Sequence, residues 1–140
     1  MVGGSFTEVT DAGRTTTYRR DNLFAYDLVT GRVLPDFRPS VAGPVYGLAP
    51  GDRGTVYVGG EFLGVDNLRS RALARLSLAN GALVPGFAPR IGGGSVTALV
   101  DRGAGSTSAA TSSARAPRWP GSTWTPARPI RISRSRPGTR

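Results

Sequence analysis

The chain has 140 residues, a formal net charge of +9 and 39% hydrophobic residues, which fits one domain if most of the chain contributes to the core. It contains no Cys and no His, so disulfides, thiolate metal sites and the commonest general base are excluded. We therefore expect no cofactor and no metal. The apolar runs are too short for a membrane span, and the N-terminus lacks the pattern of a signal peptide.

The positive charge is concentrated in the last forty residues. Residues 1–100 hold ten Arg against eight acidic residues, whereas residues 101–140 hold eight Arg against Asp101 alone. All basic residues are Arg, which is typical of a GC-rich coding sequence. The nearly neutral first part gives no signal for nucleic-acid binding.

In chain order, the first segment of the protein returns later as a second copy. Three blocks match in order: Val2–Phe6 with Val58–Phe62 at an offset of 56, Thr30–Pro39 with Asn80–Pro89 at 50, and Val45–Leu48 with Val96–Leu99 at 51. The difference of six residues indicates an insertion near Thr10–Arg20. A period of this length predicts a repeat architecture.

Within one copy, short β-favouring runs alternate with turns. The expected strands are Val45–Leu48, Thr55–Val58, Leu73–Leu78 and Ala82–Val84, with turns at Pro50–Gly54 and Asn80–Gly81 between them. No window has helical periodicity over three turns. The pattern thus predicts four antiparallel strands in each copy. Such a unit must stack on its copies, and radial stacking gives a β-propeller, with a β-solenoid as the alternative.

Four blocks carry a resemblance to a known family: Val56–Phe62, Arg71–Leu76, Asn80–Leu83 and Phe87–Pro89. They resemble the delta-sixty repeat of bacterial β-propellers over residues 2–100. The resemblance implies a propeller fold and a large parent protein that is extracellular or attached to the cell surface. The family has no assigned reaction, so the resemblance implies no catalytic residues.

We therefore predict an all-β protein of two incomplete four-stranded antiparallel β-propeller blades with a disordered C-terminal extension. The first repeat covers residues 1–49 and is truncated at its N-terminus, the second covers residues 50–100, and the extension covers residues 101–140. A closed propeller needs about four to eight blades. Two blades leave lateral edges open, so we expect marginal stability or self-association through those edges.

The extension has two interpretations. One is a genuine low-complexity linker rich in Ala, Ser and Thr. The other, which we favour, is a third repeat read in a shifted frame: Ser106–Ser133 can be re-read as LYVGGDFFGARPALAGLDLDTGAPDPDF. The single codons of Trp119 and Trp124 constrain that reading. The loop after its Phe is four residues shorter than the corresponding loop of the second copy.

The extension also contains a basic cluster with interleaved aromatic residues, a pattern that is found in proteins that bind single-stranded nucleic acid. Its members are Arg115, Arg118, Arg128, Arg131, Arg134, Arg136, Arg140, Trp119 and Trp124. Because Arg codons are common in every frame of GC-rich DNA, we interpret the cluster as accidental. It would still bind nucleic acid non-specifically in a salt-sensitive manner.

Polar and glycine residues of the repeats offer few sites. Glu8, Asp11 and Glu61 could supply paired carboxylates for glycoside hydrolysis. The scattered Asp27, Asp36, Asp52 and Asp66 could hold Ca²⁺, but turn and cap roles are favoured. Gly59–Gly60 and Gly92–Gly94 lack the pattern of a phosphate loop, and a close approach of neighbouring backbones is favoured.

The aromatic residues of the repeats are expected to pack between blades rather than to form a carbohydrate platform; they are Tyr26, Tyr46, Tyr57, Phe37 and Phe87. We predict no catalytic, cofactor-binding or metal-binding residues. The expected role is non-enzymatic binding or surface display, with a glycan or a protein as ligand. The alternatives are a fragment of a carbohydrate-active propeller enzyme and the non-specific binding of nucleic acid by the Arg-rich tail.

Overall fold

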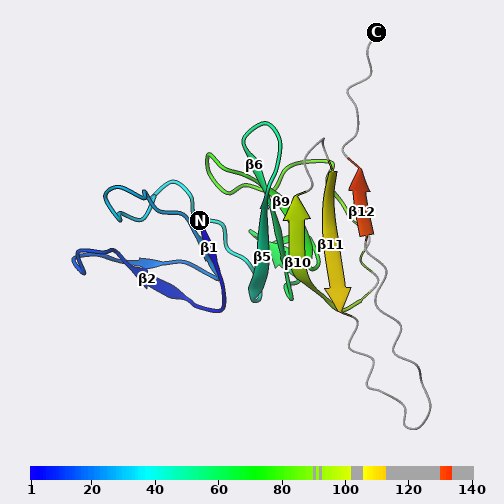
Figure 1. Ribbon diagram of the computed structural model, residues 1–140. Coiled ribbons are helices and arrows are strands. Elements are labelled where there is room, and N and C mark those ends of the chain that lie inside the picture. Colours follow the sequence, from blue (N-terminus) through cyan, green and yellow to red (C-terminus); the bar gives the residue numbers. More distant parts are fainter. Residues whose placement is uncertain (90, 92, 102–105, 113–129, 134–140) are drawn as a thin grey trace.

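Figure 1 shows the computed structural model of the chain, which describes residues 1–89, 91, 93–101, 106–112 and 130–133, the last two ranges as backbone. The described residues are all β, without helices, and form five antiparallel sheets. Their strands are β1 (Val2–Gly3), β2 (Glu8–Thr10), β3 (Thr17–Arg19), β4 (Leu23–Phe24), β5 (Val45–Pro50), β6 (Thr55–Gly60), β7 (Gly64–Val65), β8 (Leu68–Arg69), β9 (Leu73–Ser77), β10 (Ser95–Asp101), β11 (Ser106–Ser112) and β12 (Ile130–Ser133).

We call β1–β4 with the segment up to β5 the first unit, and β5–β9 with the segment up to β10 the second unit, so the second unit begins a few residues before the second sequence repeat. In the second unit, β5, β6 and β9 form a meander and pair in chain order. The expected fourth strand is reduced to a single bridge between Leu76 and Leu83. Pro85 has no N–H to donate, which limits further pairing on this side. A small hairpin, β7–β8, fills the connection between β6 and β9.

The first unit reproduces this pairing residue by residue. Val2 pairs with Phe24 and Gly3 with Leu23, as Val58 pairs with Ala74 and Gly59 with Leu73 in the second unit. The bridge between Tyr26 and Val33 likewise corresponds to the bridge between Leu76 and Leu83. The repeat in the sequence is therefore also a repeat in the backbone pairing.

The extension departs from the expectation. We expected disorder over residues 101–140, but β11 pairs with β10 and β12 pairs with β11, so the expectation is wrong for these two segments. The ladder needs only backbone N–H and C=O groups and a free strand edge, which β10 offers to β-tolerant Ser and Thr residues. A register shift between Val96 and Ala98 matches the one between Val45 and Gly47 in β5–β6.

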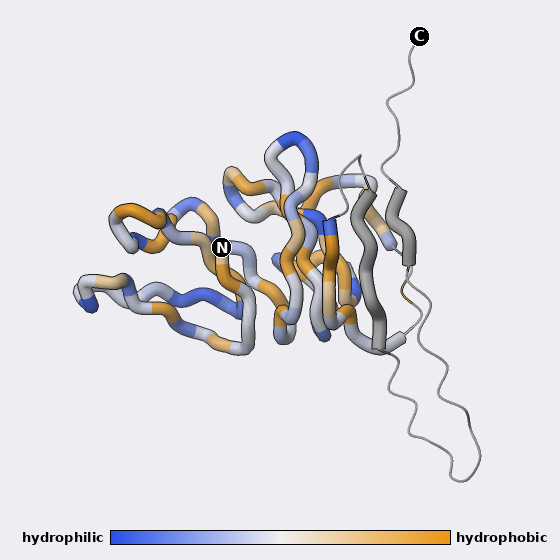
Figure 2. The backbone as a smooth tube through the Cα atoms, viewed as in Figure 1, coloured by the Kyte–Doolittle hydropathy of each residue, from blue (hydrophilic) through white to orange (hydrophobic). Residues whose placement is uncertain are grey.

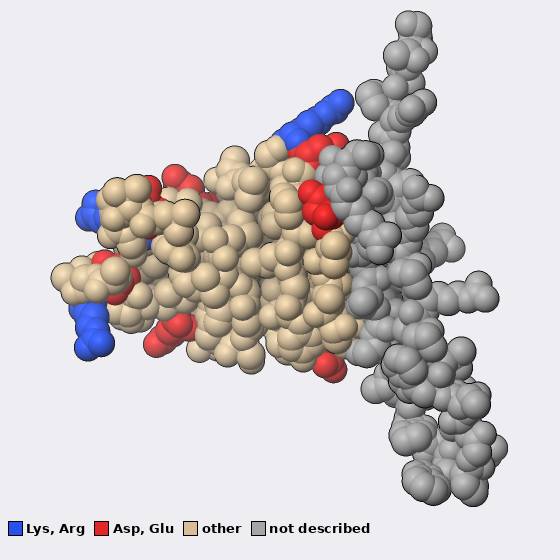
Figure 3. All heavy atoms as spheres, in the orientation of Figure 1, with Lys and Arg blue, Asp and Glu red and all other residues tan. Residues whose placement is uncertain are grey.

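Two apolar clusters hold the units together. The larger joins the first two units and includes Leu23, Phe37 and Val45 together with Val58 and Leu76. The smaller joins the second unit to β10 through Leu73 and Val96. Figure 2 shows apolar stretches running along the strands where the units meet, and Figure 3 shows that charged side chains lie mostly at the margins of the described face. The units thus stack in a row, and the described sheets form no closed ring.

Candidate functional site

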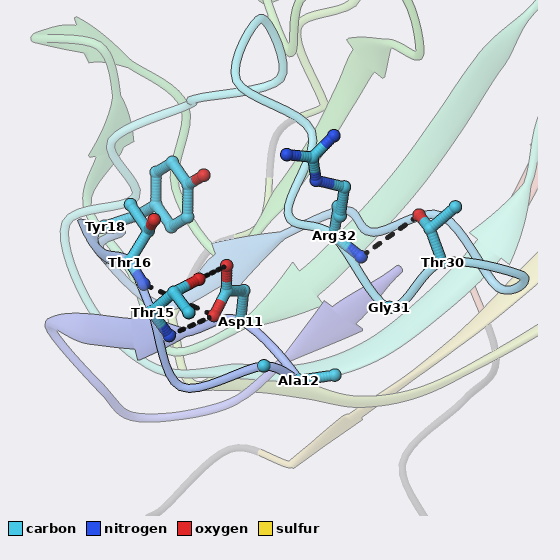
Figure 4. A pocket seen from close by; sticks show the side chains of 9 residues that line it. Asp11, Ala12, Thr15, Thr16, Tyr18, Thr30, Gly31 and Arg32 are labelled. Carbon is cyan, nitrogen blue, oxygen red and sulfur yellow. Dashed lines mark hydrogen bonds between the residues drawn. The ribbon is translucent and has the colours of Figure 1, made fainter.

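The first unit has a surface pocket of about 250 Å³ at its outer end (Figure 4). One wall is the loop between β2 and β3 together with the ring of Tyr18, and the other wall is the turn that ends at Arg32. The lining residues are Asp11, Ala12, Gly13, Thr15, Thr16, Tyr18, Thr30, Gly31 and Arg32.

The carboxylate of Asp11 closes the first wall. Its Oδ1 accepts the backbone N–H groups of Thr15, at 2.9 Å, and Thr16, at 3.3 Å, and its Oδ2 accepts the Thr15 hydroxyl at 3.0 Å. Donation from the Thr15 backbone is the main cause that lowers the pKa of Asp11, and the nearby charge of Arg32 acts in the same direction. Asp11 is thus an ionised acceptor that fixes the loop.

The second wall is an Asx turn built by Asp27. Its Oδ1 accepts the backbone N–H groups of Thr30 (2.8 Å) and Val29 (2.9 Å) and the Thr30 hydroxyl (3.1 Å). These bonds, led by the Thr30 N–H, lower the pKa of Asp27. Within the turn, Gly31 has a φ of 69°.

The two walls touch at Gly31 and Ala12. The Ala12 N–H donates to the Gly31 carbonyl at 3.4 Å, and a Cβ on Gly31 would lie 2.6 Å from the Ala12 Cβ. Glycine is therefore required at position 31 by its positive φ and by the close contact. This contact sets the floor of the pocket.

Arg20 ties the hairpin to the segment that follows the turn. The residue is 8% exposed, and its guanidinium donates to the carbonyls of Arg19, at 2.8 Å, and Leu34, at 3.3 Å. Burial is the main cause that lowers the pKa of Arg20. Among the described residues its Nε is a buried side-chain donor without a partner. Burying this unpaired donor costs free energy of folding next to the pocket.

The pocket arises where the two repeats differ in length. In the second unit, Val65 pairs with Leu68 across the two-residue turn Asp66–Asn67, whose φ angles are 51° and 64°. In the first unit, Val9 pairs with Tyr18, so eight residues, 10–17, stand in place of two. The expected insertion is thus an extended hairpin, and its tip forms one pocket wall.

The three carboxylates that could have served glycoside hydrolysis have separate surroundings. Asp11 is held by Thr15 and Thr16 as described, and Glu8 lies on β2 opposite Arg19. Glu61 follows β6 and accepts the Tyr46 hydroxyl at 3.3 Å. Partial burial, with Glu61 as the second cause, raises the pKa of Tyr46. No group of three or more acidic side chains converges in the part of the chain that the structure describes.

The four aspartates that could have formed a Ca²⁺ site have local surroundings, which fit the turn and cap roles favoured from the sequence. Asp66 accepts the Ser40 N–H at 2.8 Å, and Asp52 is ion-paired with Arg75. Arg75 also donates to the Thr55 hydroxyl at 3.0 Å and lies 5.7 Å from the centre of the Tyr57 ring. Asp27 builds its turn, and Asp36 lies on the exposed surface.

The glycine and aromatic residues follow the expectation in part. Gly60 is approached by the backbone of Pro44, as expected, whereas Gly59 is approached by the side chain of Val96 and Gly93 by no atom within 4 Å. Gly92 lies outside the described residues. Tyr57 and Phe37 are each 1% exposed, and Phe87 packs on Tyr57 with ring centres 5.5 Å apart. Tyr26 packs on Phe24 of its own unit rather than between units, and Tyr46 is 49% exposed, so for Tyr46 the expected packing between blades is wrong.

The basic cluster of the extension cannot be placed as a site. Arg131 lies on β12, which is described as backbone, and the other Arg and Trp residues of the cluster lie outside the described residues. The residues that sequence reasoning missed are the pocket residues Thr15, Thr16, Tyr18, Thr30 and Arg32. The length difference between the repeats was the signal that could have found them.

No family model, no curated protein and no solved structure matches the chain. In the described residues, no helix is long and apolar enough to cross a membrane.

Proposed function

We propose that the chain is a non-enzymatic binding module made of propeller-type repeats, and that its first unit holds a small polar ligand in the pocket between the Asp11–Thr16 loop and the turn at Asp27–Arg32. The observation that carries the proposal is that the extra hairpin length, residues 10–17, forms one wall of the pocket together with Tyr18. The repeat pairing itself does not need these residues, because the second unit joins the same strands with Asp66–Asn67.

The lining of the pocket suits one sugar residue of a glycan. The hydroxyl group of Thr16 and the guanidinium of Arg32 offer hydrogen bonds, and Tyr18 offers an aromatic face. The volume lies below the roughly 300–1,000 Å³ of pockets for drug-sized ligands. The resemblance of the repeats to those of surface-attached bacterial proteins supports a place outside the cell, where such a ligand would be met.

The carboxylates support binding over catalysis. Asp11 uses both oxygens to hold its own loop, so it has little capacity left as a nucleophile or a general acid. Glu61 is bonded to Tyr46 in the second unit. A glycosidase needs two carboxyl groups about 5–10 Å apart on either side of the scissile bond.

The test is ligand-observed NMR of the whole chain against a panel of mono- and oligosaccharides. We expect saturation transfer from Tyr18 to at least one sugar, lost in Tyr18→Ala and retained in the control Tyr46→Ala, which removes an exposed ring elsewhere. Replacing residues 10–17 by Asp-Asn, the turn of the second unit, should abolish the signal while the fold stays intact by circular dichroism. Sugar binding that survives this replacement would show that the pocket is not the binding site.

The same samples separate the alternative functions. Sugar turnover that is lost in Glu61→Gln would show an enzyme and contradict the proposal. Binding of single-stranded nucleic acid that is lost on deleting residues 101–140, with no sugar bound by the whole chain, would also contradict the proposal. It would show that the Arg-rich tail binds nucleic acid instead.

A further inference from the structure

Arg32 projects from a turn that does not need an arginine. In the first unit, the Gly31 N–H donates to the Asp27 carbonyl and the Asp27 N–H donates to the Arg32 carbonyl, each at 2.9 Å. The corresponding turn of the second unit, residues 77–82, is closed by the same two bonds at 2.8 and 2.9 Å, with Ala82 in the place of Arg32. Because the backbone closes in the same way with alanine, the arginine side chain is not a requirement of the turn.

The guanidinium of Arg32 is available to a ligand. The residue is exposed and lines the pocket. In the part of the chain that the structure describes, the ion pairs are formed by other arginines, and the hydrogen bond that Arg32 donates to the Thr30 hydroxyl comes from its backbone N–H. Figure 4 shows the Arg32 guanidinium and the Tyr18 hydroxyl at the end of the pocket that lies away from Ala12.

The carboxylate of Asp11 limits where an anion can lie. An ionised carboxylate has about four acceptor positions, and Asp11 uses three of them for Thr15 and Thr16. One position is left for a hydroxyl of a ligand. A negative group would be repelled by Asp11 and attracted by Arg32. The two side chains therefore favour a ligand with hydroxyl groups at one end and a negative charge at the other.

A second positive charge lies beside the aromatic wall. Arg20 is 8% exposed and does not line the pocket, and its guanidinium carbon lies 5.3 Å from the centre of the Tyr18 ring. Among the described residues, its guanidinium donates to backbone carbonyls and forms no ion pair with an acidic residue. An arginine keeps its charge inside a protein. Because this charge has no counter-ion and is poorly screened by water, it adds to the attraction of an anion toward Tyr18.

We infer that the pocket selects an acidic sugar, a hexuronate residue whose carboxylate binds Arg32 while its ring lies on Tyr18 and one of its hydroxyls donates to Asp11. This inference deepens the proposed function and rests on it. A guanidinium and a carboxylate can form two parallel hydrogen bonds, which fix the orientation of the ligand as well as its charge. The pocket thereby discriminates a uronate from the corresponding hexose, which has a neutral hydroxymethyl group in place of the carboxylate.

Saturation transfer to matched ligands tests the inference on the whole chain. Glucuronate, its methyl ester and glucose share one ring and differ in the charge at one carbon, and galacturonate, its methyl ester and galactose form a second such set. We expect the acid of at least one set to bind about tenfold more tightly than its neutral counterparts, because hydrogen bonds to charged groups are stronger. Equal binding of the acid and its methyl ester in both sets would overturn the inference.

Variants of Arg32 locate the selectivity. Arg32→Ala introduces the residue that the second unit has at this position, so the turn should persist, and the variant should bind an acid and its methyl ester alike. Arg32→Lys should keep part of the preference, since it keeps the charge but not the planar fork. The matched control is Arg69→Ala, which removes an exposed positive charge from β8 and should keep the full preference. A preference that survives in Arg32→Ala, or that is lost in Arg69→Ala, would contradict the assignment to Arg32.

Acetate separates recognition of a sugar acid from binding of any carboxylate. It carries the charge without a ring for Tyr18 or a hydroxyl for Asp11, so an equal concentration of acetate should leave the saturation of glucuronate or galacturonate unchanged. Full displacement by acetate would show a general anion site and would overturn the inference.

Failure of this inference and failure of the proposed function are distinguishable. Acidic and neutral sugars that bind equally, with binding lost in Tyr18→Ala, would uphold the pocket as a sugar site and overturn its selectivity for acids. Absence of binding by every sugar, acidic or neutral, would overturn the proposed function and the inference together.

Discussion

Gly59 lies so close to Val96 that a Cβ added to the glycine would stand 2.5 Å from the valine Cγ1. Gly3 meets Val45 in the same way between the first two units, at the corresponding positions of the repeat. The chain therefore uses one contact, glycine of one unit against valine of the next, at both junctions of the row.

The Gly59–Val96 contact predicts that Gly59→Ala destabilises the protein by about 1–3 kcal/mol, because overpacking forces the junction apart. Denaturant unfolding at fixed protein concentration measures the change. Gly13→Ala is the control, since a Cβ there meets only ordinary contacts with Thr15, and it should change stability by less than about 0.5 kcal/mol. The double variant with Val96→Ala should recover part of the loss; no recovery would reject the contact as the cause.

The repeat also allows a comparison of two equivalent phenylalanines. Phe37 and Phe87 occupy the same place in their copies, but Phe37 is 1% exposed in the larger cluster, whereas Phe87 is half-buried at the margin of the smaller one. Phe37→Ala should cost about 3–5 kcal/mol. Phe87→Ala should cost roughly half as much, since less area leaves water there. Equal losses in thermal unfolding of the two variants would show that both junctions are packed alike.

The sequence predicted those features that repeat. Val58 and Ala74, which pair in the structure, lie in two segments that were predicted as antiparallel strands of one copy, Thr55–Val58 and Leu73–Leu78. The φ of 76° at Gly81 follows from the predicted Asn80–Gly81 turn. The position of the insertion was also visible, since the offset falls from 56 to 50 between Val9 and Tyr18.

Features that depend on single contacts could not be predicted. Nothing in the local sequence places Ala12 against Gly31, because the contact joins two loops whose spacing the fold decides. Nor did the polar run Ser106–Ser112 predict β11, which pairs with β10 in the backbone. The expected fourth strand at Ala82–Val84 shrank to one bridge because a turn and Pro85 confine it.

Acid should open the pocket through Asp11. The hydrogen bonds from Thr15 and Thr16 hold the folded-state pKa of Asp11 below its ordinary value of 3.8, so the unfolded loop binds its proton at a higher pH than the folded loop does. Ionised Asp11 therefore stabilises the loop fully above about pH 4, and this contribution is lost as the pH falls through the lower, folded-state pKa. Asp27 has a pKa lowered in the same direction and should loosen the opposite wall in the same range.

Amide chemical shifts measure the acid effect at the loop itself. The Thr15 and Thr16 N–H signals should titrate with a midpoint below 3.8, the ordinary pKa of the carboxyl group. In Asp11→Asn, which keeps an amide oxygen as acceptor but has no titrating group, the Thr15 shift should stay flat over that range. The Val29 and Thr30 signals report Asp27 separately and should still move in this variant, because their acceptor is unchanged. A Thr15 midpoint at or above the ordinary value would mean that Asp11 does not hold the loop in solution, since a carboxylate that accepts these bonds must be harder to protonate than a free one.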